Sequence, residues 1–207
     1  AATAYVLPFG ETFDSIDTYM PNQWNSYKGI ALSDLLTGKK SFDAETPLNV
    51  SGSTTNYWGY NNNNANALSD AQHIGVEIYH TYSGSWLLTP VIELSSVAED
   101  ERVVLSFDAA LTYWNSAAEP TSSDNQRFYL LVSEDAGATW TKKNAIIWSN
   151  STSDSAQYRL SDIATGTGTQ YMFDFTGYAG KTIQIALGVE ASANDNRLHI
   201  DNFNLYT

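Results

Sequence analysis

The residues that could carry out catalysis in this sequence are carboxylates and histidines on segments that alternate between apolar and polar side chains. A glycoside hydrolase needs two carboxylates roughly 5–9.5 Å apart. The candidate carboxylates are Glu77, Glu93 and Asp108. A polysaccharide lyase needs a histidine or tyrosine base beside a cation, and the candidate bases are His73, His80 and His199. Either reaction would make the chain a carbohydrate-active enzyme.

Short motifs that would mark an active site are missing. The sequence has no E-x-D-x-x-E run, H-E-x-x-H pattern, phosphate-binding loop or dinucleotide-binding fingerprint, and no Ser–His–Asp order. It has no cysteine, which excludes thiol catalysis, disulfides and Cys-ligated zinc or iron–sulfur sites. A glycoside hydrolase or polysaccharide lyase on a jelly-roll fold is therefore the alternative hypothesis, and a non-catalytic role is the main one.

Aromatic residues beside polar amides form two candidate ligand-binding groups. Sugar-binding surfaces stack aromatic rings on pyranose faces and bond the hydroxyls with amide and acidic side chains. The first group is Tyr57, Trp58 and Tyr60, followed by four asparagines, and the second is Tyr113, Trp114 and Asn115. The other interpretation is that Trp58 and Trp114 fill the ends of the sandwich.

The charge of the chain limits its partners. The 23 acidic and 10 basic residues give a net charge of −13. Wrapping a phosphate backbone requires a basic face, so nucleic acids and anionic membrane surfaces are poor partners. The sequence also has no apolar run of about 18 residues, the length that would span a membrane.

The stretch Arg127–Thr141 (RFYLLVSEDAGATWT) predicts a β-hairpin. Both faces of its first arm are apolar, so we expect this strand to be covered on both sides. The octapeptide Ser133–Trp140 matches the Asp-box, S-x-D-x-G-x-T-W. Sialidase propellers carry this motif, but one blade needs roughly 40–50 residues and only one copy is present. We therefore interpret Asp135 as a turn residue, with Gly137 at a positive φ.

The rest of the chain predicts an all-β fold. Short alternating segments separated by polar turns suggest about a dozen strands, as in a β-sandwich or jelly roll. We expect residues 1–207 to form one domain, with an irregular Asn-rich insert near residues 49–70.

Several local elements can be predicted as well. We expect a short helix at Leu32–Leu36, a weak strand at Lys40–Phe42, and two strands in Trp86–Leu94 that are broken at Thr89–Pro90. Two further expectations concern the second half of the chain: a strand at Gln157–Leu160, and a hairpin in which Gln170–Phe175 pairs with Lys181–Val189.

In their order and spacing, several of these stretches resemble the MAM-like adhesin jelly rolls of secreted bacterial proteins. These are the cleaved-adhesin and choice-of-anchor J domains, which include the adhesin repeats of gingipains. The similarity spans nearly the whole chain. It rests on Phe9–Asp14 with Trp24, Ser85–Leu94, Leu105–Ala109, the Asp-box hairpin, Phe173–Val189 and Leu198–Phe203.

The resemblance implies a galactose-binding-like or MAM-like β-sandwich without a catalytic centre, secreted or displayed on a cell surface, alone or within a larger surface protein. Its implied partner is a glycan or a host or matrix protein, bound through loops at one end. It also implies that the first and last strands lie together, where a structural calcium ion would bind. The implied calcium ligands are Glu11, Asp14, Asp108 and Asp201. Alternatively, these acids cap turns or pair with Arg197 and Arg102.

Overall fold

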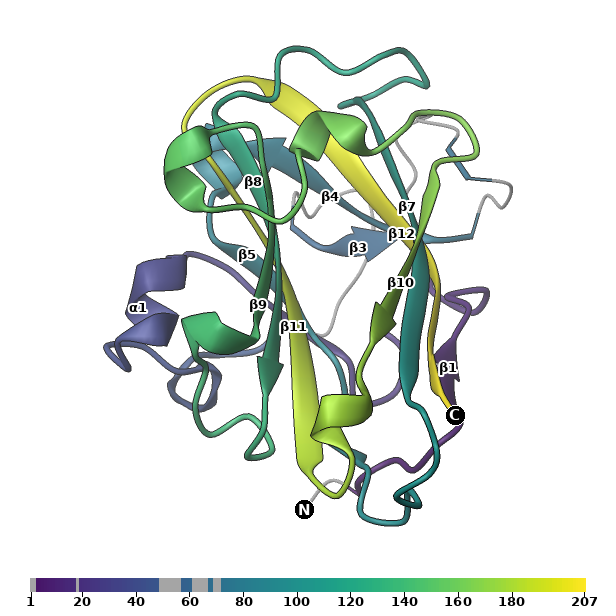
Figure 1. Ribbon diagram of the computed structural model, residues 1–207. Helices are drawn as coiled ribbons and strands as arrows, with labels where there is room; N and C mark the ends of the chain where they lie inside the picture. Colours follow the sequence, from purple (N-terminus) through teal and green to yellow (C-terminus); the bar gives the residue numbers. More distant parts are fainter. Residues whose placement is uncertain (1–2, 18, 49–56, 61–66, 69–71) are drawn as a thin grey trace.

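The computed structural model describes residues 3–17, 19–48, 57–60, 67–68 and 72–207. In this part of the chain, twelve strands form two antiparallel sheets of six strands each, which pack face to face (Figure 1). The predicted all-β sandwich is therefore confirmed. No helix among the described residues is long and apolar enough to cross a membrane.

The first sheet is built around the last strand of the chain. Its strand order is β10-β7-β12-β4-β3, and β1 also pairs with β12. The pairing of β1 with β12 confirms that the first and last strands lie together. The bounds are β1 Phe9–Glu11, β3 Gly59–Tyr60, β4 Ile74–Tyr79, β7 Val104–Tyr113, β10 Thr169–Asp174 and β12 Asp195–Tyr206.

The second sheet has the order β2-β5-β11-β8-β9, with β6 also paired to β11. The predicted break at Thr89–Pro90 is confirmed, because β5 ends at Leu88 and β6 begins at Ile92. The hydroxyl of Thr89 accepts a hydrogen bond from the Ile185 amide at 3.1 Å and so continues the pairing. The bounds are β2 Asn25–Tyr27, β5 Ser85–Leu88, β6 Ile92–Glu93, β8 Gln126–Ser133, β9 Ala145–Ser149 and β11 Thr182–Ala191.

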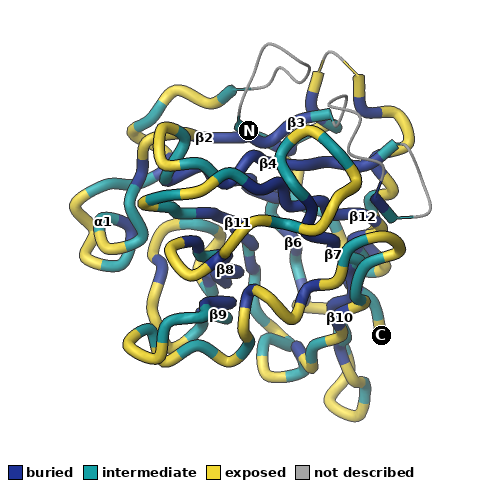
Figure 2. Tube along the Cα trace, turned by 90° about the horizontal axis from the view of Figure 1, so that it is seen from above, coloured by how far each residue is buried: buried dark blue, intermediate teal, exposed yellow. Residues whose placement is uncertain are grey.

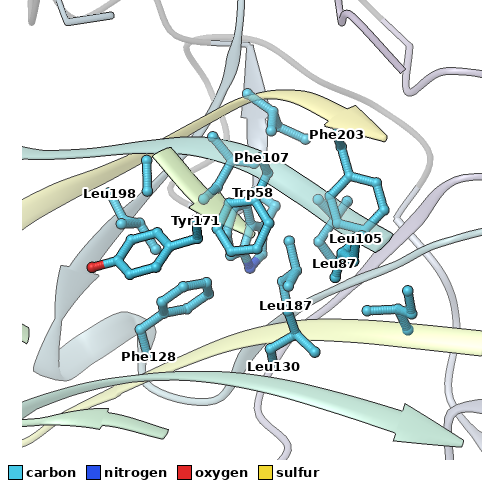
Figure 3. Close-up of a cluster of buried hydrophobic side chains, with 14 of the residues drawn as sticks. Trp58, Leu87, Leu105, Phe107, Phe128, Leu130, Tyr171, Leu187, Leu198 and Phe203 are labelled. Carbon is cyan, nitrogen blue, oxygen red and sulfur yellow. The ribbon is translucent and has the colours of Figure 1, made fainter. Parts of the chain in front are cut away.

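The main hydrophobic core lies between the two sheets (Figure 3). Because successive side chains of a strand point to opposite faces, alternate residues of β7, β8, β11 and β12 enter it. Each fully buried side chain of this size contributes roughly 1.5–3 kcal/mol of hydrophobic stabilisation. In Figure 2 the buried backbone follows the strands, and most of the exposed backbone lies in the connecting loops. Labelled members of the core include Leu105, Phe107, Phe128, Leu130, Leu187 and Phe203.

A second, smaller core covers the outer face of the second sheet. The helix α1 (Leu32–Leu36) is present as predicted and packs there with Phe42, Trp86 and Trp140. Tyr129 and Leu131 of β8 enter this cluster, whereas Phe128 and Leu130 enter the main core. The prediction that β8 is covered on both sides is therefore confirmed.

The hairpin after β8 closes as the sequence predicts. One carboxylate oxygen of Asp135 accepts hydrogen bonds from the Ser133 hydroxyl at 2.6 Å and from the Thr139 amide at 2.9 Å. Gly137 has a φ of 93°. Hydrogen bonds from Ser133 and Thr139 lower the pKa of Asp135 below its ordinary value. Asp135 is therefore a turn residue.

Three expected strand features are wrong. β10 pairs with β7 in the first sheet, whereas β11 pairs with β5, β6 and β8 in the second, so these strands do not form a hairpin. The segment after β10 crosses between the layers instead. The expected strand at Lys40–Phe42 is absent, and Phe42–Ala44 forms a 3₁₀ turn. In place of the strand at Gln157–Leu160 there is one bridge at Tyr158, followed by a 3₁₀ turn at Leu160–Asp162.

Candidate functional site

Loops gather at one end of the sandwich, the upper end in Figure 1. The loop of residues 114–125 connects β7 to β8, and the segment 150–168 connects β9 to β10. These two connections enclose a pocket of about 590 Å³, a volume within the roughly 300–1,000 Å³ range of small-molecule sites. Most of its lining side chains are hydroxyls, amides, acids or a guanidinium. They include Ser122, Ser123, Asp124, Asn150, Arg159, Ser161 and Asp162.

Asn150 joins the two walls of this pocket. Its amide nitrogen donates to the Ser123 hydroxyl at 2.8 Å and to Asp124 Oδ1 at 3.3 Å. Its amide oxygen accepts hydrogen bonds from the backbone amide and the hydroxyl of Ser161, both at 3.1 Å. The Thr165 hydroxyl joins the same two walls, because it donates to Glu119 at 3.0 Å.

The first wall is fixed from below by a buried amide pair. Asn196, at the start of β12, accepts hydrogen bonds from the Thr121 backbone amide at 2.8 Å and from its hydroxyl at 3.1 Å. Asn196 donates to Gln126 Oε1 at 2.8 Å, and Gln126 donates to the Ile78 carbonyl at 3.1 Å. Because Asn196 and Gln126 are both 0% exposed, this connection ties the loop to the first sheet.

A smaller pocket of about 330 Å³ adjoins the first one and shares Asn150, Arg159 and Asp162 with it. Tyr158 lines this second pocket, and its ring stacks on the buried Trp148 at a centroid distance of 5.3 Å. Together the two pockets form one polar cleft with an aromatic ring at one end. We call it the loop cleft.

The second predicted aromatic group lies beside the loop cleft but does not line either pocket. Tyr113 ends β7, and its backbone amide donates to the Ala118 carbonyl at 3.0 Å, one residue before the cleft wall begins. Tyr113 and Trp114 are half-buried with their rings 6.3 Å apart, and Asn115 is exposed.

The first predicted aromatic group is divided. Tyr57 is half-buried, with its ring 5.7 Å from Tyr82 and the Lys28 ammonium 5.2 Å from its centroid. Tyr60 is half-buried against the main core. The asparagines that follow lie outside the described residues.

Trp58 does not form part of a binding platform. It is 0% exposed, and its indole nitrogen donates to the Ser85 carbonyl at 3.1 Å. Its ring lies within the main core (Figure 3). The prediction of Trp58 as a ligand-stacking residue is therefore corrected, because a fully buried ring cannot stack on a sugar.

The four acids predicted to bind calcium are not assembled into one site. No group of three or more acidic or histidine side chains within the described residues could hold a metal ion. Asp108 and Asp201 are opposite partners in the β7–β12 register, and Asn202 bonds both, with its amide nitrogen on Asp108 at 2.9 Å and its backbone nitrogen on Asp201 at 2.9 Å. These four residues therefore do not fit one calcium ion as predicted.

The other two of these acids act locally. Glu11 accepts a hydrogen bond from the Phe13 amide at 2.7 Å, and burial raises its pKa above the ordinary value. Asp14 is exposed, and its backbone amide donates to the Thr12 hydroxyl at 3.4 Å. Calcium binding itself stays a prediction of the resemblance.

The carboxylates of the alternative, hydrolytic hypothesis are dispersed. Glu77 lies on β4 in the first sheet, and Glu93 lies on β6 in the second, where it accepts a hydrogen bond from Ser95 at 2.8 Å. Asp108 is bonded to Asn202. These contacts do not pair the predicted carboxylates across a substrate cleft.

Two of the three histidines are buried on the outer face of the first sheet, and the third is exposed. His73 and His199 contact each other, with His73 Nε2 2.8 Å from His199 Nδ1. Burial, followed by the charges of His73 and Arg197, lowers the pKa of His199 well below its ordinary value. His80 is exposed, and the centroid of its ring lies 4.1 Å from that of the Tyr79 ring.

The same outer face carries a buried charged cluster that the sequence does not reveal. Glu77 is 6% exposed and hydrogen-bonds to Asp195, and burial raises the pKa of Glu77 to about 7. Arg197 is 2% exposed, and burial lowers its pKa to about 10, so the guanidinium keeps its charge at neutral pH. Perturbed groups of this kind concentrate at functional sites.

The sequence prediction missed the residues that build the loop cleft. Asn150 and Ser123 are 27 positions apart, and only the register of β8 with β9 brings them together. The single available signal was the Ser/Thr/Asp-rich composition of residues 150–162, which predicts loops but not which loops meet.

No protein-family model matches the chain, and neither does any curated protein sequence. Among solved structures, the chain is similar to the K1 cleaved adhesin domain of Lys-gingipain from Porphyromonas gingivalis. The identity is 12% and the TM-score 0.52, with 97% of this chain and 98% of that chain covered. The K3 cleaved adhesin domain of the same protein gives 11% identity and a TM-score of 0.52, with 96% and 98% covered.

A third similar structure is TmCBM61 in complex with β-1,4-galactotriose, with 16% identity and a TM-score of 0.41 over 72% of this chain and 79% of that one. The chain shares the β-sandwich fold of the two cleaved adhesin domains. The resemblance drawn from the sequence is confirmed at the level of the fold.

Proposed function

We propose that this chain is a non-catalytic extracellular module that binds a glycan in the loop cleft. The observation that carries this proposal is the density of fixed hydrogen-bonding groups around the 590 Å³ pocket. Sugar hydroxyls each require a donor and an acceptor. The pocket walls offer both, and the side chain of Asn150 already holds the two walls in place. Pre-organised walls reduce the entropy lost on binding.

The fold supports a binding role. The sandwich that the chain shares with cleaved adhesin domains places long loops at one end of rigid sheets, an arrangement that suits recognition. A secreted or surface location follows from the same proposal. The net charge of −13 favours a neutral glycan over a polyanionic one in this cleft, which Asp124 and Asp162 line.

A glycan array followed by affinity electrophoresis tests the proposal. We expect retention of the wild-type protein by at least one neutral polysaccharide, and about tenfold weaker retention of Arg159→Ala, because one lost charge-assisted hydrogen bond is worth roughly that factor. Arg102→Ala is the matched control. Arg102 is another exposed arginine, and it precedes the opposite end of β7.

Two results would overturn this proposal. Equal retention of folded Arg159→Ala and wild type would remove the loop cleft as the binding site. Release of reducing ends or unsaturated products from a polysaccharide would show that the chain is an enzyme.

A further inference from the structure

The smaller pocket of the loop cleft has one aromatic ring in a largely polar lining. Tyr158 is the only aromatic residue among the described residues that line this pocket, and it is half-buried. Most of the other lining side chains carry hydroxyl, amide, acid or guanidinium groups. Several of them, including Thr152, Ser155 and Arg159, are exposed. A ligand can therefore reach the tyrosine from solvent.

Neighbouring rings leave one face of Tyr158 open. Its ring stacks on Trp148, which is 0% exposed, at a centroid distance of 5.3 Å and an interplanar angle of 21°. The Tyr171 ring is 5.2 Å from that of Trp148 and 5.4 Å from that of Tyr158, and the Phe173 ring is 6.0 Å from each. A ring that is equally distant from both members of a stack lies beside the stack. Neither Tyr171 nor Phe173 therefore covers the outer face of Tyr158.

The backbone holds this ring in place. The Tyr158 amide donates to the Ile147 carbonyl at 3.2 Å, and its carbonyl accepts from the Ser149 amide at 2.9 Å. Both partners belong to β9, so Tyr158 adds one bridge to the edge of the second sheet. The side chain of Gln157 also bonds to this strand, donating to the Ala145 carbonyl at 3.2 Å. An aromatic face that is already fixed loses little entropy when a ligand covers it.

A donor and an acceptor lie close to this ring in the cleft. Arg159 and Asp162 line both pockets, and both are exposed. Among the described residues, no carboxylate lies within the 4.0 Å of an ion pair with the Arg159 guanidinium. One oxygen of Asp162 accepts a hydrogen bond from the Arg159 backbone amide at 3.3 Å, and a carboxylate has room for further donors. Both side chains can therefore bond to the hydroxyls of a ligand.

We propose that the loop cleft binds a galactose-configured sugar whose pyranose ring stacks on Tyr158. This inference rests on the proposed function, because it assigns the sugar that the same cleft binds. A single platform covers only one face of a sugar ring, so it selects a sugar whose two faces differ. In β-galactopyranose the axial 4-hydroxyl makes one face polar and leaves a continuous patch of C–H groups on the other. The hydroxyls of β-glucopyranose are all equatorial, so its two faces are more alike.

The same orientation places the polar face of the sugar. When the C–H patch lies on Tyr158, the axial 4-hydroxyl points away from the tyrosine and into the polar part of the cleft. Arg159 can donate to this hydroxyl and Asp162 can accept from it. The equatorial 4-hydroxyl of a glucoside points along the plane of the ring instead and does not make the same pair of bonds.

An NMR titration of the wild-type protein with methyl β-galactopyranoside tests the proposal. Methyl β-glucopyranoside, which differs only in the configuration of the 4-hydroxyl, is the ligand control. We expect the galactoside to bind about tenfold more tightly than the glucoside. It should also shift the ring signals of Tyr158 and the indole signals of Trp148, which lies directly beneath that ring.

Variants of Tyr158 test the platform itself. Tyr158→Ala should bind the galactoside about tenfold more weakly, because it removes the stacking face. Tyr158→Phe keeps the ring and should bind as wild type does. Tyr158→Leu covers the case in which Tyr158→Ala does not fold, since leucine still covers Trp148 but offers no flat face, and it should also weaken binding. Tyr19→Ala is the matched control, because Tyr19 is 65% exposed and lines neither pocket.

Several results would overturn this inference. Galactoside binding that is absent, or no tighter than glucoside binding, would overturn the assignment of a galactose-configured sugar. Unshifted signals of Tyr158 and Trp148, or equal binding by wild type and the folded Ala and Leu variants, would overturn the platform.

These failures can be told apart from a failure of the proposed function. Retention by a polysaccharide that depends on Arg159 but not on Tyr158 would keep the loop cleft as a glycan site and overturn only the stacked galactose. An array on which no glycan retains the wild-type protein would overturn both.

Discussion

Glu77 and Arg197 are direct partners across β4 and β12, yet no ion pair within 4.0 Å joins them in the described part of the chain. Glu77 bonds to Asp195 instead, and Arg197 lies over Gly75. The strand register alone would predict an ion pair between these two opposite charges. The structure keeps the two charges apart. This arrangement has consequences for stability that can be measured.

The first prediction concerns the pH dependence of stability. Burial and Asp195 raise the pKa of Glu77 to about 7 from 4.5, so the folded state holds a proton that the unfolded state releases. The contribution is fully present below pH 4.5 and is lost as the pH rises toward 7. We expect the melting temperature of wild type to fall across this window relative to Glu77→Gln.

Melting curves of both proteins between those two pH values measure this effect. The curve of Glu77→Gln should be flatter, since glutamine does not titrate. Glu11, whose pKa burial also raises, titrates in both proteins and so cancels in the comparison. Parallel curves would show that Glu77 does not hold the proton.

Trp58 gives the second prediction. Because its ring is fully buried in the main core, Trp58→Ala should lower the free energy of unfolding by about 3–5 kcal/mol. Trp114→Ala is the matched control: Trp114 is half-buried, so we expect a smaller loss. Urea denaturation measures both. A Trp58→Ala variant as stable as wild type would contradict the burial of this ring.

Asp135 gives the third prediction. Its carboxylate accepts hydrogen bonds from Ser133 and Thr139, so Asp135→Ala should destabilise the protein by about 1–2 kcal/mol at neutral pH. Hydrogen bonding lowers the pKa of Asp135 below 3.8. The stabilisation is therefore present above pH 3.8 and is lost as the pH falls through the folded-state pKa.

Urea denaturation in neutral and in strongly acidic solution measures whether this stabilisation is lost as the pH falls. The difference between wild type and Asp135→Ala should shrink in acid, because both then lack the charge. Asp100→Ala is a control outside the hairpin, since Asp100 is an exposed acid. A difference for Asp135→Ala that does not depend on pH would contradict the proposed role of the charge.

The fourth prediction concerns calcium. Asp108 and Asp201 oppose each other but both bond to Asn202, and Glu11 and Asp14 do not join them in a metal-binding group. We therefore expect Asp201→Asn to change the difference in melting temperature between calcium and EDTA by less than about 2 °C, which is worth less than about 1 kcal/mol. A larger rise in melting temperature with calcium, abolished in Asp201→Asn, would support the calcium site predicted from the resemblance.

Local features of this fold could be predicted from the sequence. The Asp-box turn, the helix at Leu32–Leu36 and the break at Thr89–Pro90 each depend on residues a few positions apart. Turn chemistry and the missing amide of proline act over that range. The pairing of β1 with β12 came from the family resemblance rather than from such local rules.

Features that depend on register could not be predicted. Whether β10 and β11 form a hairpin is decided by which sheet each one joins, and the turn at Thr176–Tyr178 fits both outcomes. The sequence left two interpretations of Trp58 open, a buried ring and a ligand-stacking ring, and the burial observed in the structure decides between them. Arg197 and Gly75 meet only across two strands that are 122 residues apart in sequence.

The central position of β12 also determines when the first sheet can be completed during synthesis. β12 supplies the strand between β7 and β4 and the only described partner of β1. Until Asp195–Tyr206 has emerged from the ribosome, β1, β4 and β7 lack the neighbour that joins them. A chain that has not yet reached Asp195 therefore exposes open strand edges, which are sites of aggregation, and the twelve residues of β12 close all three edges at once.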